Sequence, residues 1–140
     1  MVPLPKKTQE NAGKRTEAHY KTLTTPEDIS YDERLKYLDR PSLQFRRLRG
    51  DLIQMYNMLQ NKDNNQDYKY FFDINENNTR GHNLKLTKPQ CKIEIRKNSF
   101  ALRHINIWNN LSHRTVNAKN TNDFKNMVDS ELKHLKYDYE

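Results

Sequence analysis

The apolar positions of the chain first follow a helical period. Ser30 and Glu33 have the spacing of a capping box, and apolar residues follow them three and four positions apart, which predicts a helix over residues 31–38. Pro41 suits the first turn of a second helix. Five apolar residues in that helix recur at intervals of three and four: Phe45, Leu48, Leu52, Met55 and Leu59. This spacing places all five on one face, so the pattern predicts a long amphipathic helix.

Beyond Asn83 the apolar period shortens to two. Lys88-Pro89-Gln90 forms a polar break between two alternating stretches, and it has the composition of a turn. The apolar residues that share a face are Leu84 and Leu86 in the first stretch, and Cys91, Ile93 and Ile95 in the second. The pattern predicts a β-hairpin with one apolar face.

Helical spacing returns after the predicted hairpin. Residues 98–111 carry a wide apolar face around Trp108, suited to covering the hairpin. Thr121 is a candidate cap for a last helix, whose apolar residues repeat at three- and four-residue spacing: Phe124, Val128, Leu132 and Leu135. Because a two-stranded hairpin alone is marginal in water, the helices must pack against it. We therefore predict a small α+β domain over residues 30–136, mostly helical, with about four helices around one β-hairpin.

The segment before this domain has a different composition. Residues 1–28 are polar, are interrupted by three prolines and a glycine, and show no sustained apolar period. Such a segment cannot bury enough apolar surface to offset the entropy of ordering it. We expect a disordered, basic and polar N-terminal tail.

Composition limits the class of protein further. Hydrophobic residues make up 34% of the 140 residues, so the core must be small. Cys91 is the single cysteine, which excludes an intramolecular disulfide and agrees with a reducing compartment. No apolar run reaches the roughly 18 residues of a membrane span, and residues 1–10 lack the apolar centre of a signal peptide. We expect a soluble, intracellular protein, nuclear or cytoplasmic, without a membrane partner.

Positive charge is concentrated in one part of the chain. Residues 80–119 hold nine of the 25 Lys and Arg residues but one of the 18 Asp and Glu residues, Glu94. A local block of positive charge favours polyanions, so nucleic acid is the expected partner. The candidate phosphate-binding residues, three of which fall on the polar face of the predicted hairpin, are Arg80, Lys85, Lys92, Arg96, Lys97 and Arg103. A merely solvated face stays an alternative, although such faces usually mix both signs of charge.

No pattern indicates catalysis or a bound metal. Ser112-His113 are neighbours in sequence, which does not make a catalytic triad, and a polar loop explains them better. His82, His104, His113 and Cys91 lack the paired spacing of zinc ligands. The three glycines are isolated, so there is no phosphate-binding loop. We predict that the chain is not an enzyme on its own and needs no cofactor. Trp108 is more plausible in the core than stacked on a base.

Several short motifs resemble a known family in their order and spacing. They run in sequence as Pro41-Ser42-Leu43, Arg46-Arg47, Arg49-Gly50-Asp51-Leu52-Ile53, Tyr56, Thr79-Arg80-Gly81-His82, Lys85-Leu86, Lys88-Pro89, Arg96-Lys97, Phe100, Arg103, Trp108-Asn109, Leu111 and Phe124-Lys125. Together they resemble the C-terminal, thumb-side region of reverse transcriptases from non-LTR (LINE-type, jockey-like) retrotransposons, over residues 30–135. Ser99 and Ser112 depart from the family, which usually has Phe and often has Pro there.

The resemblance implies a region that grips template and primer in an RNA-directed DNA polymerase. The family's two metal ions are held by palm aspartates, and the Tyr-x-Asp-Asp-type palm motif is absent here. Any magnesium would therefore belong to the missing palm, and the chain is expected to be a remnant that contacts nucleic acid without polymerase activity. Two alternatives stay open: a protein-interaction or self-association module exposing the former palm-docking surface, and a decayed element fragment with no selected function.

Overall fold

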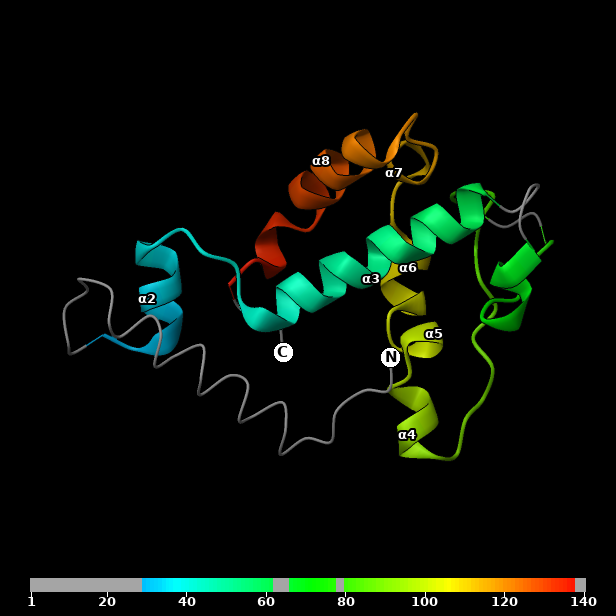
Figure 1. Ribbon diagram of the computed structural model, residues 1–140, viewed down its shortest axis with the longest axis horizontal. Helices are drawn as coiled ribbons and strands as arrows, with labels where there is room; N and C mark the ends of the chain where they lie inside the picture. The colour runs from blue at the N-terminus through cyan, green and yellow to red at the C-terminus, as the bar shows by residue number, and fades with distance from the viewer. Residues whose placement is uncertain (1–28, 62–65, 78–79, 138–140) are drawn as a thin grey trace. The chain divides into compact units, whose positions relative to one another are not determined.

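The computed structural model describes residues 29–61, 66–77 and 80–137 (Figure 1). They belong to two compact units: Leu48–Glu131, and residues 29–47 together with 132–137. We call these the first and the second unit and describe each by itself. The predicted disordered tail, residues 1–28, lies outside the described residues, and the assignment of residues 30–136 to one domain stays a prediction.

The described residues form helices joined by irregular segments. The α-helices are α2 (Tyr31–Tyr37), α3 (Leu43–Gln60), α4 (Glu94–Lys97), α5 (Phe100–Arg103), α6 (Ile105–Asn110), α7 (His113–Val116) and α8 (Thr121–Glu131), and the 3₁₀-helices are η1 (Gln66–Tyr70) and η2 (Lys133–Leu135). No β-strand occurs in the described part of the chain, so the prediction of an α+β fold was wrong. None of the helices described is long and apolar enough to cross a membrane.

The predicted β-hairpin is replaced by a loop and a short helix. β pairing in the described segments amounts to an isolated antiparallel bridge between Ile74 and Leu86. The predicted second strand instead leads into α4, and its apolar residues Ile93 and Ile95 are 65% and 71% exposed. An ion pair between Lys97 Nζ and Glu94 Oε1, 2.8 Å long and three residues apart, suits a helical turn. The alternation of apolar and polar residues there marks no buried face.

The first predicted helix is confirmed and lies in the second unit. The Ser30 N–H donates to Glu33 Oε2 at 3.0 Å, and the Glu33 N–H donates to Ser30 Oγ at 3.3 Å, completing the capping box of α2. Leu35 on its inner face is fully buried. After the helix, Asp39 accepts hydrogen bonds from Lys136 Nζ and from the Tyr137 hydroxyl, both at 2.6 Å. Local capping thus set the boundary of α2.

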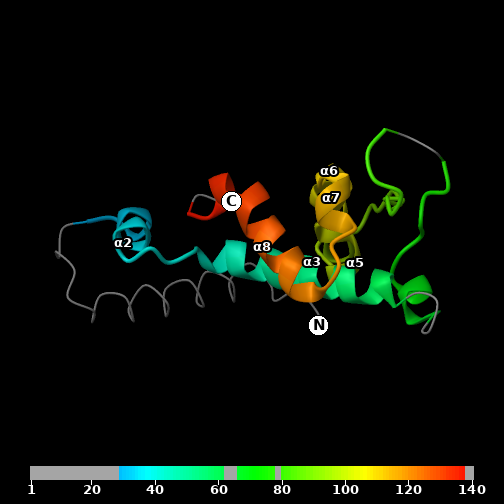
Figure 2. The ribbon, with the colours of Figure 1, turned by 90° about the horizontal axis from the view of Figure 1, so that it is seen from above.

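The long amphipathic helix is also confirmed as α3, and all five apolar residues of its predicted stripe are buried. Within the first unit, aromatic rings from α3, α6 and α8 pack together. Figures 1 and 2 show the course of these three helices. The Tyr56 ring stacks on Phe124 with centroids 4.2 Å apart, and Trp108 lies 6.1 Å from Phe124. Trp108 has no exposed surface, which confirms its place in the core.

The helix predicted over residues 98–111 is interrupted at His104, between α5 and α6. Both Arg103 and His104 contact the carboxylate of Asp51. Successive residues of a continuous α-helix point about 100° apart, so two neighbours reach one carboxylate more easily across a break. The backbone N–H of Trp108 then donates to the His104 carbonyl at 2.9 Å and starts α6.

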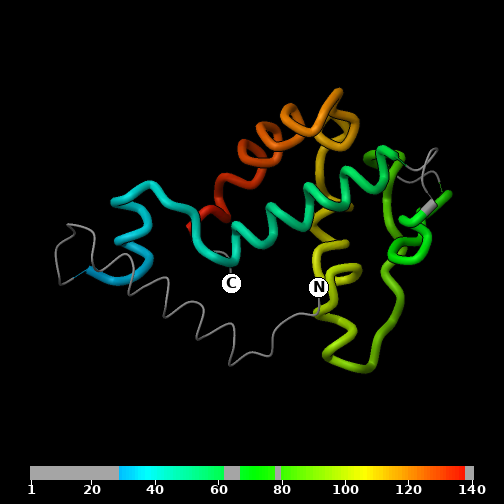
Figure 3. The backbone as a smooth tube through the Cα atoms, in the orientation of Figure 1, coloured from blue at the N-terminus to red at the C-terminus, as the bar shows by residue number. Residues whose placement is uncertain are grey.

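The last predicted helix is confirmed as α8 over Phe124 and Val128, but it ends at Glu131, so Leu132 and Leu135 of the predicted stripe lie beyond it. Its cap also differs from the predicted one. Asn120 Oδ1 accepts the backbone N–H of Asp123 at 2.8 Å, so Asn120 caps the helix rather than Thr121. Thr121 Oγ1 donates to Asn57 Oδ1 at 2.9 Å and ties α8 to α3. Between η1 and α4 the chain is largely irregular (Figure 3), and this stretch carries three of the six candidate cations, Arg80, Lys85 and Lys92.

Candidate nucleic-acid interface

Side chains of α6 fasten the extended segment that carries Lys85. Trp108 Nε1 donates to the Leu84 carbonyl at 2.8 Å. Asn109 Nδ2 donates to the Leu86 carbonyl and Asn109 Oδ1 accepts the Leu86 N–H, each at 2.8 Å. We call the segment 84–86 with these three bonds the clasp. It gives buried main-chain groups the partners that a neighbouring strand would otherwise supply.

The clasp fixes which side chains turn inward. Leu84 and Leu86 are buried, with 6% and 2% exposure, and Lys85 between them is half-buried. The ammonium group of Lys85 donates to the backbone carbonyl of Arg80. Gly81 makes this approach possible, because its φ of +114° suits glycine and an added Cβ would lie 3.0 Å from Lys85 Cε. Lys85 therefore closes a turn as well as contributing charge.

Among residues 80–97, four cations are exposed and form no ion pair with another described residue: Arg80, Lys88, Lys92 and Arg96. We call them the basic strip. Arg96 lies in α4, and the other three lie in the irregular chain before it. Lys88 falls in the predicted turn and is not among the six predicted candidates, although its charge belongs to the positive block of residues 80–119. The strip offers full positive charges that solvent or a polyanion can reach.

Two predicted candidates already have acidic partners. Lys97 pairs with Glu94 at the surface. Arg103 forms a bidentate pair with Asp51, with Nε to Oδ2 at 2.6 Å and Nη2 to Oδ1 at 2.8 Å. This pair joins α5 to α3, so Arg103 has a structural role and we leave it out of the interface proposed below.

The Asp51 carboxylate also lies 3.0 Å from His104 Nε2. Burial alone would raise the pKa of Asp51, but hydrogen bonds from His104 and Arg103 outweigh it and hold the pKa below its usual value. Asp51 therefore stays ionised at neutral pH and keeps Arg103 in place.

The arrangement expected for these cations also changes with the fold. Lys85, Lys92 and Arg96 were predicted on the polar face of a hairpin, and the described residues contain no sheet to supply that face. Their charges are instead presented by an irregular segment and one turn of helix. That the six predicted residues bind nucleic acid stays a prediction.

Aromatic side chains lie close to one end of the basic strip. Tyr70 and Phe71 line a cavity of about 240 Å³ together with Arg96. Tyr70 is 86% exposed and Phe71 is 47% exposed, which is unusual for large apolar rings. In the sequence, residues 68–72 are rich in aromatics but too few to show a clear apolar period.

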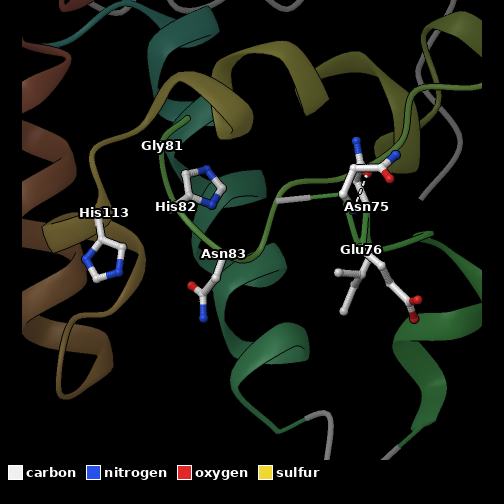
Figure 4. A pocket seen from close by; sticks show the side chains of 8 residues that line it. Asn75, Glu76, Gly81, His82, Asn83 and His113 are labelled. Carbon is white, nitrogen blue, oxygen red and sulfur yellow. Dashed lines mark hydrogen bonds between the residues drawn. The ribbon is translucent and has the colours of Figure 1, made fainter. Parts of the chain in front are cut away.

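A larger polar pocket of about 510 Å³ is lined from three stretches of the first unit: residues 74–77, residues 81–83, and His113 (Figure 4). His82 is 2% exposed, and its Nε2 lies 2.9 Å from the Trp108 carbonyl. A carbonyl oxygen can only accept, so Nε2 carries the hydrogen. Burial lowers the pKa of His82 and keeps the ring neutral.

The other ring nitrogen of His82, Nδ1, is shielded from water and has no hydrogen-bond partner among the described residues. Through Nε2, His82 ties the chain just before the clasp to α6. Within the described residues no three His, Cys, Asp or Glu side chains gather closely enough to hold a metal ion.

Comparisons of the chain with protein-family models, with curated proteins and with solved structures find no match. The resemblance to reverse transcriptases therefore rests on the sequence motifs. Several motif residues make contacts within the first unit: His82, Trp108 and Asn109 at the clasp, and Arg103 with Asp51. In this chain those positions hold the fold together.

Proposed function

We propose that this chain binds RNA or DNA without sequence preference, through phosphate contacts made by the basic strip. The observation that carries the proposal is the exposure of Arg80, Lys88, Lys92 and Arg96 without an ion-pair partner among the described residues. Free cations exchange counterions for phosphates, which gives affinity that falls with salt. Phosphate contacts position a nucleic acid and do not distinguish its bases.

The resemblance to the thumb-side region of non-LTR retrotransposon reverse transcriptases supports the same role. That region grips template and primer, whereas polymerase chemistry and magnesium belong to a palm whose motif has no counterpart in this sequence. Our proposal therefore assigns the chain backbone contact and no catalytic step. Such a role belongs in the nucleus or the cytoplasm, where the nucleic acid is.

Charge reversal at the basic strip tests the proposal. Lys92→Glu with Arg96→Glu changes two exposed side chains, so folding should be kept, and affinity for an oligonucleotide should fall at least about tenfold. A matched control, Arg46→Glu with Lys133→Glu, makes the same change in net charge at two exposed positions outside the strip. If both double variants lost affinity equally, the loss would be explained by net charge alone, and the proposed interface would be rejected.

A second candidate function is self-association through exposed apolar side chains. Ile93 and Ile95 are 65% and 71% exposed on either side of Glu94, and isoleucine is normally among the most buried residues. Exposed apolar surface marks association sites in many proteins. A second copy of this chain could bury both side chains in a symmetric contact.

Sedimentation velocity over a range of protein concentrations distinguishes this candidate. Self-association should produce dimers whose fraction rises with concentration, and Ile93→Ser with Ile95→Ser should abolish them. Tyr37→Ser, at a tyrosine that is 67% exposed in the second unit, is the control. A monomer at every concentration would rule this candidate out and leave the nucleic-acid proposal standing.

A further inference from the structure

Two aromatic rings beside the basic strip are exposed without an evident structural need. Tyr70 ends η1 and is 86% exposed, and Phe71 follows it with 47% exposure. By contrast Tyr56, Phe72 and Trp108 are each at most 3% exposed. The first unit thus buries aromatic rings elsewhere, whereas Tyr70 and Phe71 are two neighbouring exposed rings that together form an apolar patch a partner can cover.

The Phe71 ring is held in place although half of it is exposed. Its backbone N–H donates to the Tyr68 carbonyl at 3.0 Å. Its ring meets Phe100 edge to face, with centroids 6.3 Å apart and planes at 76°, and Phe100 in turn packs 5.9 Å from Phe72. A ring fixed by such contacts loses little freedom when a second ring stacks on it.

Arg96 brings phosphate-binding charge to the same place. It lines the cavity of about 240 Å³ with Tyr70 and Phe71. Asp73 also lines this cavity, so its lining carries both a negative and a positive charge. Arg96 is the lining residue that belongs to the basic strip. The cavity is below the roughly 300 Å³ at which pockets begin to enclose a small ligand. A flat group is therefore expected to stack across exposed rings rather than to enter.

We infer that Tyr70 and Phe71 form a stacking platform for unpaired bases of the strand whose phosphates contact Arg96, so that the chain prefers single-stranded nucleic acid to duplex. This inference rests on the proposed function and specifies its ligand. Base faces in a duplex are already stacked on one another, and only an unpaired base can lie on a protein ring. Aromatic rings and cations side by side are the usual means of binding single strands without sequence preference.

The test compares three oligonucleotides of equal length: a single strand with bases, a single strand with abasic sugars, and a duplex. All three carry phosphates, and the first alone offers free base faces. The wild-type chain should bind the base-containing strand about tenfold more tightly than the abasic strand. Tyr70→Ala should remove most of that difference and leave binding to the abasic strand unchanged.

Two further variants separate stacking from effects on the fold. Tyr70→Phe keeps the ring and should bind as the wild type does. Tyr37→Ala removes a ring that is 67% exposed on α2 and should change no affinity. Because Tyr70 is 86% exposed, its removal should leave the free energy of unfolding unchanged.

Each outcome separates this inference from the proposed function. Equal affinity for base-containing and abasic strands, with salt-dependent binding of both, would overturn the platform and leave the phosphate interface intact. If Tyr70→Ala lowered the affinity for the base-containing and abasic strands equally, the platform would also be overturned, because the ring would then affect phosphate contacts or folding. If none of the three oligonucleotides bound in a salt-dependent way, the proposed function itself would fail.

Discussion

The side-chain amide of Asn109 pairs with both main-chain groups of Leu86, accepting its N–H at Oδ1 and donating from Nδ2 to its carbonyl, each at 2.8 Å. One helical residue thereby does what an adjacent β-strand does for an extended segment. The Asn75 N–H also donates to the Lys85 carbonyl, and the Thr87 N–H donates to the Asp73 carbonyl, each at 2.8 Å. Together these bonds keep residues 84–86 extended without a hairpin and tie the segment that carries Lys85 to α6.

Replacing Asn109 tests the importance of the clasp. Asn109→Ala leaves two main-chain groups of Leu86 without partners, and the free energy of unfolding should fall by about 2 kcal/mol. Urea denaturation monitored by Trp108 fluorescence measures it. The neighbouring exposed Asn110→Ala should change stability by less than about 0.5 kcal/mol. Equal effects of the two substitutions would contradict the role given to Asn109.

The helices could be predicted from the sequence because the interactions that define them are local. The capping box joins Ser30 and Glu33, which are three residues apart. The buried apolar residues from Phe45 to Leu59 likewise follow one another at intervals of three and four residues. The hairpin could not be excluded in this way. Leu84 and Leu86 do alternate as a strand would, but their hydrogen-bond partners are side chains more than twenty residues later in the chain.

The candidate site was predictable to a similar extent. Composition located the positive block, since charge is visible without any structure. It could not separate Arg96, which is exposed, from Arg103, whose guanidinium is held by Asp51 on another helix. Likewise the exposure of Tyr70 and Phe71 depends on how η1 packs, and five residues carry too little periodicity to show it.

The Arg103–Asp51 pair should be worth more than a second bidentate pair in the same unit. Asp51 has 14% side-chain exposure, and its loss by Asp51→Ala leaves Arg103 unpaired, so stability should fall by about 2 to 3 kcal/mol. Arg49 and Asp129 are more exposed, at 32% and 44%, so Asp129→Ala should cost at most about 1 kcal/mol. Denaturation of the two variants measures both, and the reverse order would contradict the assignment.

We expect the Asp51 carboxylate to make the free energy of unfolding fall in acid. The pKa of Asp51 in the folded chain lies below its ordinary value of about 3.9, so its contribution is complete above that pH and is lost as the pH falls further. Asp51→Ala should flatten this part of the pH profile.

His82 predicts a second dependence on pH, close to neutrality. Burial lowers its pKa in the folded chain, with Lys85 and His113 acting in the same direction, while the hydrogen bond to Trp108 and the charge of Glu131 oppose the shift. As the pH falls, the unfolded chain therefore binds the proton before the folded chain does. Protonation of His82 then lowers the free energy of unfolding as the pH falls below about 6.5. An NMR titration of the His82 ring should give a pKa below that value. A value at or above it would contradict the buried, neutral ring.

The most direct test of the phosphate interface is the salt dependence of single-strand binding. If Arg80, Lys88, Lys92 and Arg96 all engage phosphates, the slope of log affinity against log salt should be about −3. Lys92→Glu with Arg96→Glu should make the slope shallower by at least about 1.4, while Arg46→Glu with Lys133→Glu should leave it unchanged. A wild-type slope near zero, or one that the strip variant shares, would contradict the account.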